Sequence, residues 1–485
     1  MELDRSSAVL PWTKQDRSVP EMEASLLDSS AELRPPAPEP RATTLGPLGL
    51  LRVLASNPLE AWTAAHFEEP IVSGGLWTGR VVVLSDPAAI RRVLVENSAN
   101  YQKDWFQRRV LSAGLTGGLL TAESREWRVQ RRALAPLFTR NIVTSFAPAM
   151  LAAASVLVER VSQYEGETVD IAVEVTRAAL DVLQRTIFSG GLGGDREDIR
   201  VAMKAYFETI GRLDPLDVLG LPESVPRPAR WKMRQSIRLL ERAIDKIILT
   251  RHRRLAEDPG GVPDDILTLL LKAADPRTGE GLSETEIRAN ILTFIAAGHE
   301  TTANCIAWSL YLLSQSRQWR ARVQAEVDRE FTGDIATLAD RLVETRAVVD
   351  EANRLYPPIA AISRVAIGPD ELAGRSVKAG TMIVIAPYVL HRHRNLWVKP
   401  DYFDPGRFLG GTRATIDRFA YLPFGAGARV CIGSAFALQE VSIVLAALMS
   451  RFTFEVAPGH SVWPIMKITL RPQGGLPVIV RHRAR

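Results

Sequence analysis

The chain has 485 residues, of which 46% are hydrophobic and 24% charged, a balance typical of a globular protein and not of a disordered or fibrous one. The formal charge of +5 is small for this length and no Lys/Arg block dominates, so we expect no nucleic-acid binding and interpret the mild excess as a docking face for an acidic partner. Two cysteines exclude a disulfide framework, and no run of 18 apolar residues predicts a membrane span, so we expect a cytoplasmic protein.

The N-terminal part of the chain is predicted to contain little regular structure. Residues 1–43 form a polar, proline-rich extension that ends in RPPAPEPR and is predicted to be poorly ordered. Folding is expected to begin at Thr44. RVVVLSD from Arg80 predicts a short strand, and the DPAAIRRVLVEN that follows predicts a helix. Residues 106–121 are rich in glycine and leucine and are predicted to form a flexible connection.

The rest of the chain is predicted to be mainly α with a minor β part. Residues 127–274 are mostly helical, interrupted by loops at VPRP and AEDPGGVPDD. A long helix is predicted over residues 284–314, because SETE at Ser283 has the pattern of a capping box. Another helix runs to Pro357 and must end there. The short strands ISRVAIG and TMIVIAPYVL follow, and a last helix begins after Cys431.

The long predicted helix carries the sequence AAGHETT, which has features of a proton-transfer site. Gly298 lies in the middle of the helix and costs about 1 kcal/mol relative to alanine. The Thr301 hydroxyl can donate to the Ala297 carbonyl and bend the helix. Glu300 beside this alcohol suits a proton relay. A helix with polar residues on its solvent face explains the motif equally well.

Two further pairs allow both a functional and an ordinary explanation. Glu351 and Arg354 are three residues apart and share one face of a helix, as many surface ion pairs do. Trp127 and Arg131 share another helical face, where an indole N–H and a guanidinium suit an anion. A core tryptophan beside a surface arginine is the simpler explanation of this second pair.

The stretch PFGAGARVCIG surrounds Cys431 with glycines and places it before a helix. The helix N-terminus and Arg429 both favour a thiolate, which can serve as a nucleophile, a redox thiol or a metal ligand. Zinc is disfavoured because no Cys/His spacing for it is present, and thioredoxin-like chemistry is disfavoured because no CxxC is present. A haem iron requires only one protein thiolate.

These motifs together resemble those of the cytochrome P-450 haem-thiolate monooxygenases. FGAGARVCIG is similar to their FxxGxRxCxG signature at every fixed position, AGHETT to their oxygen-activation motif, and Glu351 with Arg354 to their ExxR motif. Arg407 in DPGRF resembles the arginine that joins this pair. The resemblance implies one large mainly helical domain over residues 44–485, with the haem between the long central helix and the cysteine-loop helix.

The resemblance also implies the roles of individual residues. Cys431 would be the axial thiolate of heme b, and Glu300 and Thr301 would deliver protons to the co-substrate O2. Glu351, Arg354 and Arg407 would form a structural cluster behind the haem. The other implied cofactor contacts are Trp127, Arg131, Arg364, His391, Phe424, Arg429, Gly433, Ala297 and Gly298.

The implied reaction is insertion of one atom of O2 into a hydrophobic small molecule by a monomeric enzyme. Electrons would come from NAD(P)H through a separate ferredoxin or flavodoxin and its reductase. The arginines implied to meet this carrier are Arg125, Arg128, Arg132 and Arg418. The implied pocket is lined by residues 106–120, 295–301 and 359–362.

Two other classes remain open from the sequence. A peroxygenase or a haem-thiolate isomerase would not need the acid and alcohol of Glu300 and Thr301. A non-catalytic haem sensor or carrier ranks third, because no signalling output domain is visible.

Overall fold

The computed structural model describes residues 32–76, 79–104, 107, 115–189 and 228–483. Residues from Leu33 onward belong to one compact unit, so the domain begins about ten residues earlier than the sequence predicted. Pro35 is buried, and the Pro36 carbonyl accepts a 2.8 Å hydrogen bond from the Tyr356 hydroxyl. The Leu33 carbonyl accepts another, of 2.9 Å, from the Phe403 N–H. Although prolines donate no backbone hydrogen bonds, the carbonyls of this segment still accept them. Residues 1–31 of the predicted extension lie outside the described residues.

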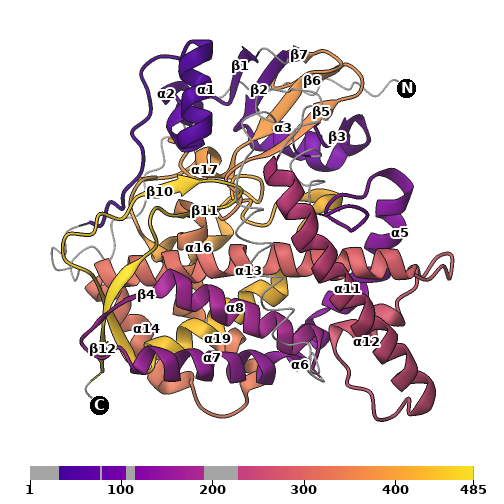
Figure 1. Ribbon diagram of the computed structural model, residues 1–485. Helices are drawn as coiled ribbons and strands as arrows, with labels where there is room; N and C mark the ends of the chain where they lie inside the picture. The colour runs from indigo at the N-terminus through magenta and orange to yellow at the C-terminus, as the bar shows by residue number, and fades with distance from the viewer. Residues whose placement is uncertain (1–31, 77–78, 105–106, 108–114, 190–227, 484–485) are drawn as a thin grey trace, which may run out of the picture. The chain divides into compact units, whose positions relative to one another are not determined.

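The fold is mainly helical with a minor β part, as predicted (Figure 1). The longer helices are α1 (Pro47–Ser56), α5 (Ser124–Leu134), α7 (Ala147–Ser162), α8 (Ile171–Ile187), α11 (Pro228–Glu257), α13 (Glu284–Gln315), α14 (Arg317–Glu330), α16 (Val343–Leu355) and α19 (Ser434–Met449). The shorter ones are α2 (Ala64–Glu68), α3 (Pro87–Arg91), α6 (Arg140–Ser145), α12 (Ile266–Leu271), α15 (Leu338–Arg341), α17 (Pro387–Leu390) and α18 (Gly410–Ala414). None of the described helices is long and apolar enough to cross a membrane.

The strands of the described residues form small sheets. The largest has the order β1-β2-β8-β5-β3, in which β2 and β8 are parallel and the other neighbours antiparallel. A second sheet has the order β4-β12-β9, and β10-β11 and β6-β7 form hairpins. The strand bounds are β1 (Ile71–Leu76), β2 (Gly79–Leu84), β3 (Tyr101–Gln102), β4 (Thr168–Asp170), β5 (Ile362–Ala366), β6 (Asp370–Leu372), β7 (Arg375–Val377), β8 (Met382–Ile385), β9 (Phe452–Val456), β10 (Pro464–Met466), β11 (Leu470–Pro472) and β12 (Pro477–His482).

Helix α13 is the central element of the helical core. The capping box forms as predicted, because the Ser283 hydroxyl accepts from the Glu286 N–H while the Glu286 carboxylate accepts from the Ser283 N–H. The helix packs against α8, α16 and α19 (Figure 1). Apolar residues on almost every side of the helix are buried, as expected for an interior helix.

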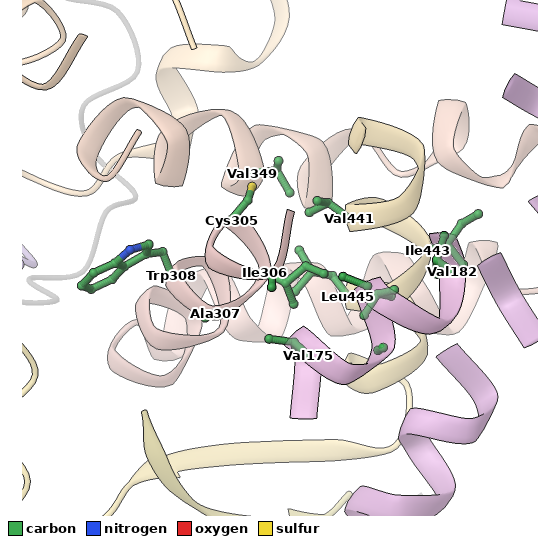
Figure 2. Packing of buried hydrophobic residues seen from close by; sticks show 14 of the residues in the cluster. Val175, Val182, Cys305, Ile306, Ala307, Trp308, Val349, Val441, Ile443 and Leu445 are labelled. Atoms are coloured by element: carbon green, nitrogen blue, oxygen red, sulfur yellow. The ribbon is translucent and has the colours of Figure 1, made fainter. Parts of the chain in front are cut away.

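Cys305 lies in this core and is 5% exposed. Figure 2 shows its side chain among apolar residues of α13, α16 and α19, with Val349 close by. Burial raises the pKa of the Cys305 thiol to about 12. It is therefore a small apolar core residue.

Candidate functional site

The loop that carries Cys431 is closed by its own backbone. The Cys431 N–H donates to the Phe424 carbonyl at 2.9 Å, and α19 begins three residues later. Gly427 has φ +71°, and a Cβ built on it would lie 1.9 Å from the Leu94 carbonyl oxygen. The structure therefore requires glycine at 427 to let the loop approach Leu94, which lies in the π-helix Arg92–Glu96.

Substitution at Gly427 is expected to test this close approach. Gly425 is the matched control, because it also has φ +71° but its Cβ would meet no atom within 4 Å. We expect Gly425→Ala to lose about 1–2 kcal/mol of unfolding free energy, the cost of left-handed backbone alone. Gly427→Ala should lose about 4 kcal/mol, because the backbone clash is added. Denaturant unfolding measures both values, and equal losses would contradict the account.

The Cys431 side chain is the exposed cysteine of the chain, although it is recessed among protein atoms. This burial raises the pKa of the Cys431 thiol, while the Gly433 N–H and the charge of Arg131 lower it. The sequence predicted that the helix N-terminus and Arg429 favour a thiolate, and in the protein alone desolvation opposes that preference. A coordinated metal ion would reverse the balance, since a coordinating thiol loses its proton.

Arg429 is held firmly beside Trp127 of α5. Its guanidinium carbon lies 4.1 Å from the centre of the indole ring. The guanidinium donates to the Glu123 carboxylate at 2.8 Å and to the Ala122 carbonyl at 2.9 Å. The cysteine loop therefore contacts the α5 face that carries Trp127, one of the two residues predicted to form an anion site there.

Four cations gather around this position. Lys103 lies 3.6 Å from Glu123, and burial together with Arg429 lowers the pKa of Lys103 to about 8. Burial also lowers the pKa of Arg364, which interacts with Glu123 and Asp104. We call Lys103, Arg131, Arg364 and Arg429 the basic cluster. Its four positive charges face only two carboxylates, those of Glu123 and Asp104. The excess of two positive charges suits a ligand that carries two negative charges.

The middle of α13 has one accessible face and one buried face. Ala297 is exposed and Thr301 is half-buried, although Ile295 and His299 beside them are buried. The Thr301 hydroxyl donates to the Ala297 carbonyl at 2.6 Å, as predicted. Ala297 and Thr301 therefore form an accessible face one turn long on α13.

Gly298 does not contribute to that face, and its predicted role is corrected. A Cβ on Gly298 would lie 3.1 Å from Leu183 of α8. The missing side chain therefore allows α13 and α8 to pack closely.

Phe138 connects α13 with the cysteine loop. Its ring contacts the Phe294 ring of α13 at a centroid distance of 5.2 Å. Its edge lies 4.0 Å from the position of a Cβ on Gly433. The two elements that the sequence placed on either side of the haem thus meet at this phenylalanine.

Residues 115–121 of the predicted flexible connection pack on α13. The Leu119 N–H donates to the Asn290 side-chain oxygen at 2.8 Å, and Gly118 lies so close that a Cβ would clash with Thr293. Of the remaining predicted pocket walls, Ala360 is buried and Ile359 is 37% exposed. Residues 106 and 108–114 lie outside the described residues.

Glu351, Arg354 and Arg407 come together as predicted. Arg354 and Glu351 are both fully buried and form two hydrogen bonds of 2.7 and 2.8 Å. Arg407 lies 3.5 Å from Glu351. Arg354 also donates to three carbonyls of the segment that leads to the cysteine loop, those of His391, Pro400 and Tyr402.

The predicted cofactor contact of His391 is not supported. The side chain is fully buried beside Tyr421, and its Nε2 accepts a 2.8 Å hydrogen bond from the Leu422 N–H. Burial and Arg354 lower the pKa of His391 to about 3, so the ring stays neutral. His391 therefore connects this segment to the start of the cysteine loop.

The site combines one accessible cysteine with a basic cluster and an acid–alcohol pair on the central helix. This arrangement suits an anionic cofactor that takes a thiol as a ligand, and comparison with known proteins identifies the class. The family model for cytochrome P-450 matches residues 35–478, so the chain belongs to this family of haem-thiolate enzymes.

Known relatives agree with the family assignment. The chain is 31% identical over 419 residues to cyclooctat-9-en-7-ol 5-monooxygenase of Streptomyces melanosporofaciens, covering 86% of this chain and 89% of the relative. It is 28% identical to a cytokinin hydroxylase of Arabidopsis thaliana, covering 84% and 80%. The crystal structure of the cytochrome P-450DA heme domain matches with a TM-score of 0.80 at 26% identity, covering 93% of this chain and 98% of that one. The chain is thus a cytochrome P-450 monooxygenase.

The residues present fit a haem. A porphyrin with two propionates carries the two negative charges that the basic cluster leaves unbalanced, and the accessible thiol provides a single iron ligand. Lys103 was missed by the sequence reasoning. Its only signal was the motif YQKDW, in which a lysine stands between polar residues as surface lysines do.

Proposed function

We propose that the protein inserts one atom of O2 into a hydrophobic small molecule, with electrons from NAD(P)H delivered by a separate ferredoxin or flavodoxin and its reductase. The observation that carries this proposal is the accessible Cys431 thiol beside a basic cluster with two unbalanced charges. The acid–alcohol pair on α13 favours monooxygenation over peroxygenase or isomerase chemistry, because those reactions need no such pair.

Heme b is the proposed cofactor, with Cys431 as its axial thiolate. When bound, it supplies the redox chemistry that activates O2. The basic cluster would hold its propionates, with Trp127 supporting the Arg429 guanidinium from one face. Phe424, whose carbonyl fixes the Cys431 N–H, would pack beside the thiolate.

Thr301 and Glu300 would handle the two protons that the reaction consumes when the second oxygen atom becomes water. The Thr301 hydroxyl now donates to the Ala297 carbonyl, so it must turn to donate towards the ligand face of α13. Glu300 directly precedes Thr301 in the chain, and its side chain is 22% exposed, so it can exchange protons with solvent.

A hydrophobic substrate is proposed because the lining residues are apolar. The most accessible residue on this face of α13 is Ala297, and residues 359–362 are all isoleucine or alanine. The relatives are named for oxygenating cyclooctat-9-en-7-ol and cytokinin, which differ, so the names favour no single substrate. A spectral-shift screen of the purified ferric holoenzyme against hydrophobic compounds would find ligands.

The function is tested by reconstituting the holoenzyme with a ferredoxin or flavodoxin, its reductase, NAD(P)H and a ligand from that screen. Product that carries one atom of labelled O2 is expected. Product formed with peroxide but never with NAD(P)H would instead favour a peroxygenase.

The arginines of the predicted docking face differ in their surroundings. Arg132 forms a bidentate ion pair with Asp275, whereas Arg128 is exposed and Arg125 is 82% exposed at 3.8 Å from Glu280. Arg418 instead lines a groove of about 190 Å³ that reaches the cysteine loop. We call this the arginine groove, and its charged residues are Arg346, Asp350, Arg413 and Arg418. Its excess of positive charge suits an acidic electron carrier.

Charge reversal at Arg418 is expected to slow electron transfer from the acidic carrier. The rate for Arg418→Glu should fall about tenfold at low salt and recover towards the wild-type rate at high salt, because screening weakens steering. Arg125→Glu is the control, since Arg125 is exposed but lies on α5 and not in the groove. Stopped-flow reduction measures the rates, and an unchanged low-salt rate for Arg418→Glu would rule out this docking face.

A further inference from the structure

The hairpin β10-β11 holds the acid of the proposed acid–alcohol pair. The Thr469 hydroxyl, in the turn of this hairpin, donates to the Glu300 carboxylate at 2.7 Å. The Asn304 amide, one turn further along α13, donates to the same hydroxyl at 3.1 Å. Thr469 and Asn304 are 4% and 7% exposed, so this chain of hydrogen bonds is shielded from water.

The direction of both hydrogen bonds is fixed by the number of hydrogens that the Thr469 hydroxyl carries. A hydroxyl has one hydrogen, and the Asn304 amide already supplies a donor to the Thr469 oxygen. Thr469 must therefore use its own hydrogen for Glu300, which accepts it as a carboxylate oxygen. A hydrogen bond from a buried donor to a charged acceptor is among the stronger kinds.

The turn itself is held rigidly against α13. The Leu470 N–H donates to the Pro358 carbonyl at 2.9 Å, and the Leu470 carbonyl accepts from the Trp308 indole at 3.4 Å. Thr301, the neighbour of Glu300 in the sequence, makes no such contact with the hairpin, since its hydroxyl donates to the Ala297 carbonyl. The acid and the alcohol thus face different partners.

On its exposed side the Glu300 carboxylate lies 3.6 Å from the Arg471 guanidinium, which is 44% exposed. We infer that Thr469 is a positioning residue that fixes the Glu300 carboxylate between the buried hairpin turn and the solvent-exposed Arg471. This inference rests on the proposed monooxygenase function. It means that the Glu300 carboxylate takes up and releases protons at its solvent-exposed Arg471 side, while Thr469 keeps it in place.

The test compares holoenzyme variants by two measurements: the position of the Glu300 carboxylate in crystal structures and the fraction of NAD(P)H electrons recovered in product. Thr469→Val removes the hydroxyl at nearly constant volume, and Thr469→Ser restores it. Thr186→Val is the matched control, because Thr186 is fully buried in α8 and its hydroxyl bonds only carbonyls of its own helix. If Thr469→Val does not fold, Thr469→Ala is measured in its place.

In Thr469→Val we expect the Glu300 carboxylate to leave the hairpin and the fraction of electrons recovered in product to fall about tenfold, as for loss of one hydrogen bond to a charged group. The missing electrons should appear as hydrogen peroxide. Thr469→Ser and Thr186→Val should match the wild type in both measurements. An undisplaced carboxylate in Thr469→Val, or a displaced one with unchanged product yield, would overturn the inference. A wild-type holoenzyme that forms no product would refute the proposed function instead, while the crystal structures still report the contact.

Discussion

Arg354→Ala is expected to yield protein that is unstable and poor in haem. The substitution leaves the fully buried Glu351 carboxylate without its bidentate partner and three backbone carbonyls without their donor. Breaking a buried ion pair from one side costs about 3–5 kcal/mol, which is a large part of the 5–15 kcal/mol that stabilises a typical domain. Denaturant unfolding and haem-to-protein ratio measure the two effects.

Haem content should fall because the three carbonyls belong to the segment that leads into the cysteine loop. The first of them is that of His391, whose ring also holds the Leu422 N–H. Arg354→Lys keeps the charge but not the planar fork, so an intermediate loss is expected.

The control for Arg354→Ala is the same change at an exposed ion pair. Arg140 pairs with Asp340, and their side chains are 76% and 57% exposed. Arg140→Ala should cost less than about 1 kcal/mol. Recovery of Arg354→Ala with full haem content and the unfolding midpoint of Arg140→Ala would contradict the structural role of the buried cluster.

The sequence predicted the features that depend on local pattern. The capping box placed the start of α13 correctly, and the helix before Pro357 ends at Leu355 as expected. The spacing of Glu351 and Arg354 alone did not distinguish a buried pair from a surface pair. Only packing shows that both side chains are fully buried.

What the sequence missed depends on contacts between distant segments. Gly298 was expected to contact the cofactor, but its close neighbour is Leu183, and the close neighbour of Gly427 in the cysteine loop is the Leu94 carbonyl. No local pattern contains such partners, because they lie more than a hundred residues away in the chain. Lys103 joins the basic cluster for the same reason.

Cys431→Ser is expected to abolish the thiolate signature of the bound haem. The central claim is that Cys431 supplies the single iron ligand, since it is exposed at the site while Cys305 is buried in the apolar core. Serine keeps the size of the side chain, but its hydroxyl is far harder to deprotonate and gives the iron much less electron density. Cys305→Ala is the matched control, because it removes the other thiol of the chain.

The most direct test is the carbon monoxide difference spectrum of the reduced holoenzyme in these three proteins. We predict the red-shifted band of a thiolate-ligated haem in the wild type and in Cys305→Ala, and its absence in Cys431→Ser. Retention of the red-shifted band in Cys431→Ser, or its absence from the wild type with haem bound, would contradict the assignment of Cys431 as the iron ligand.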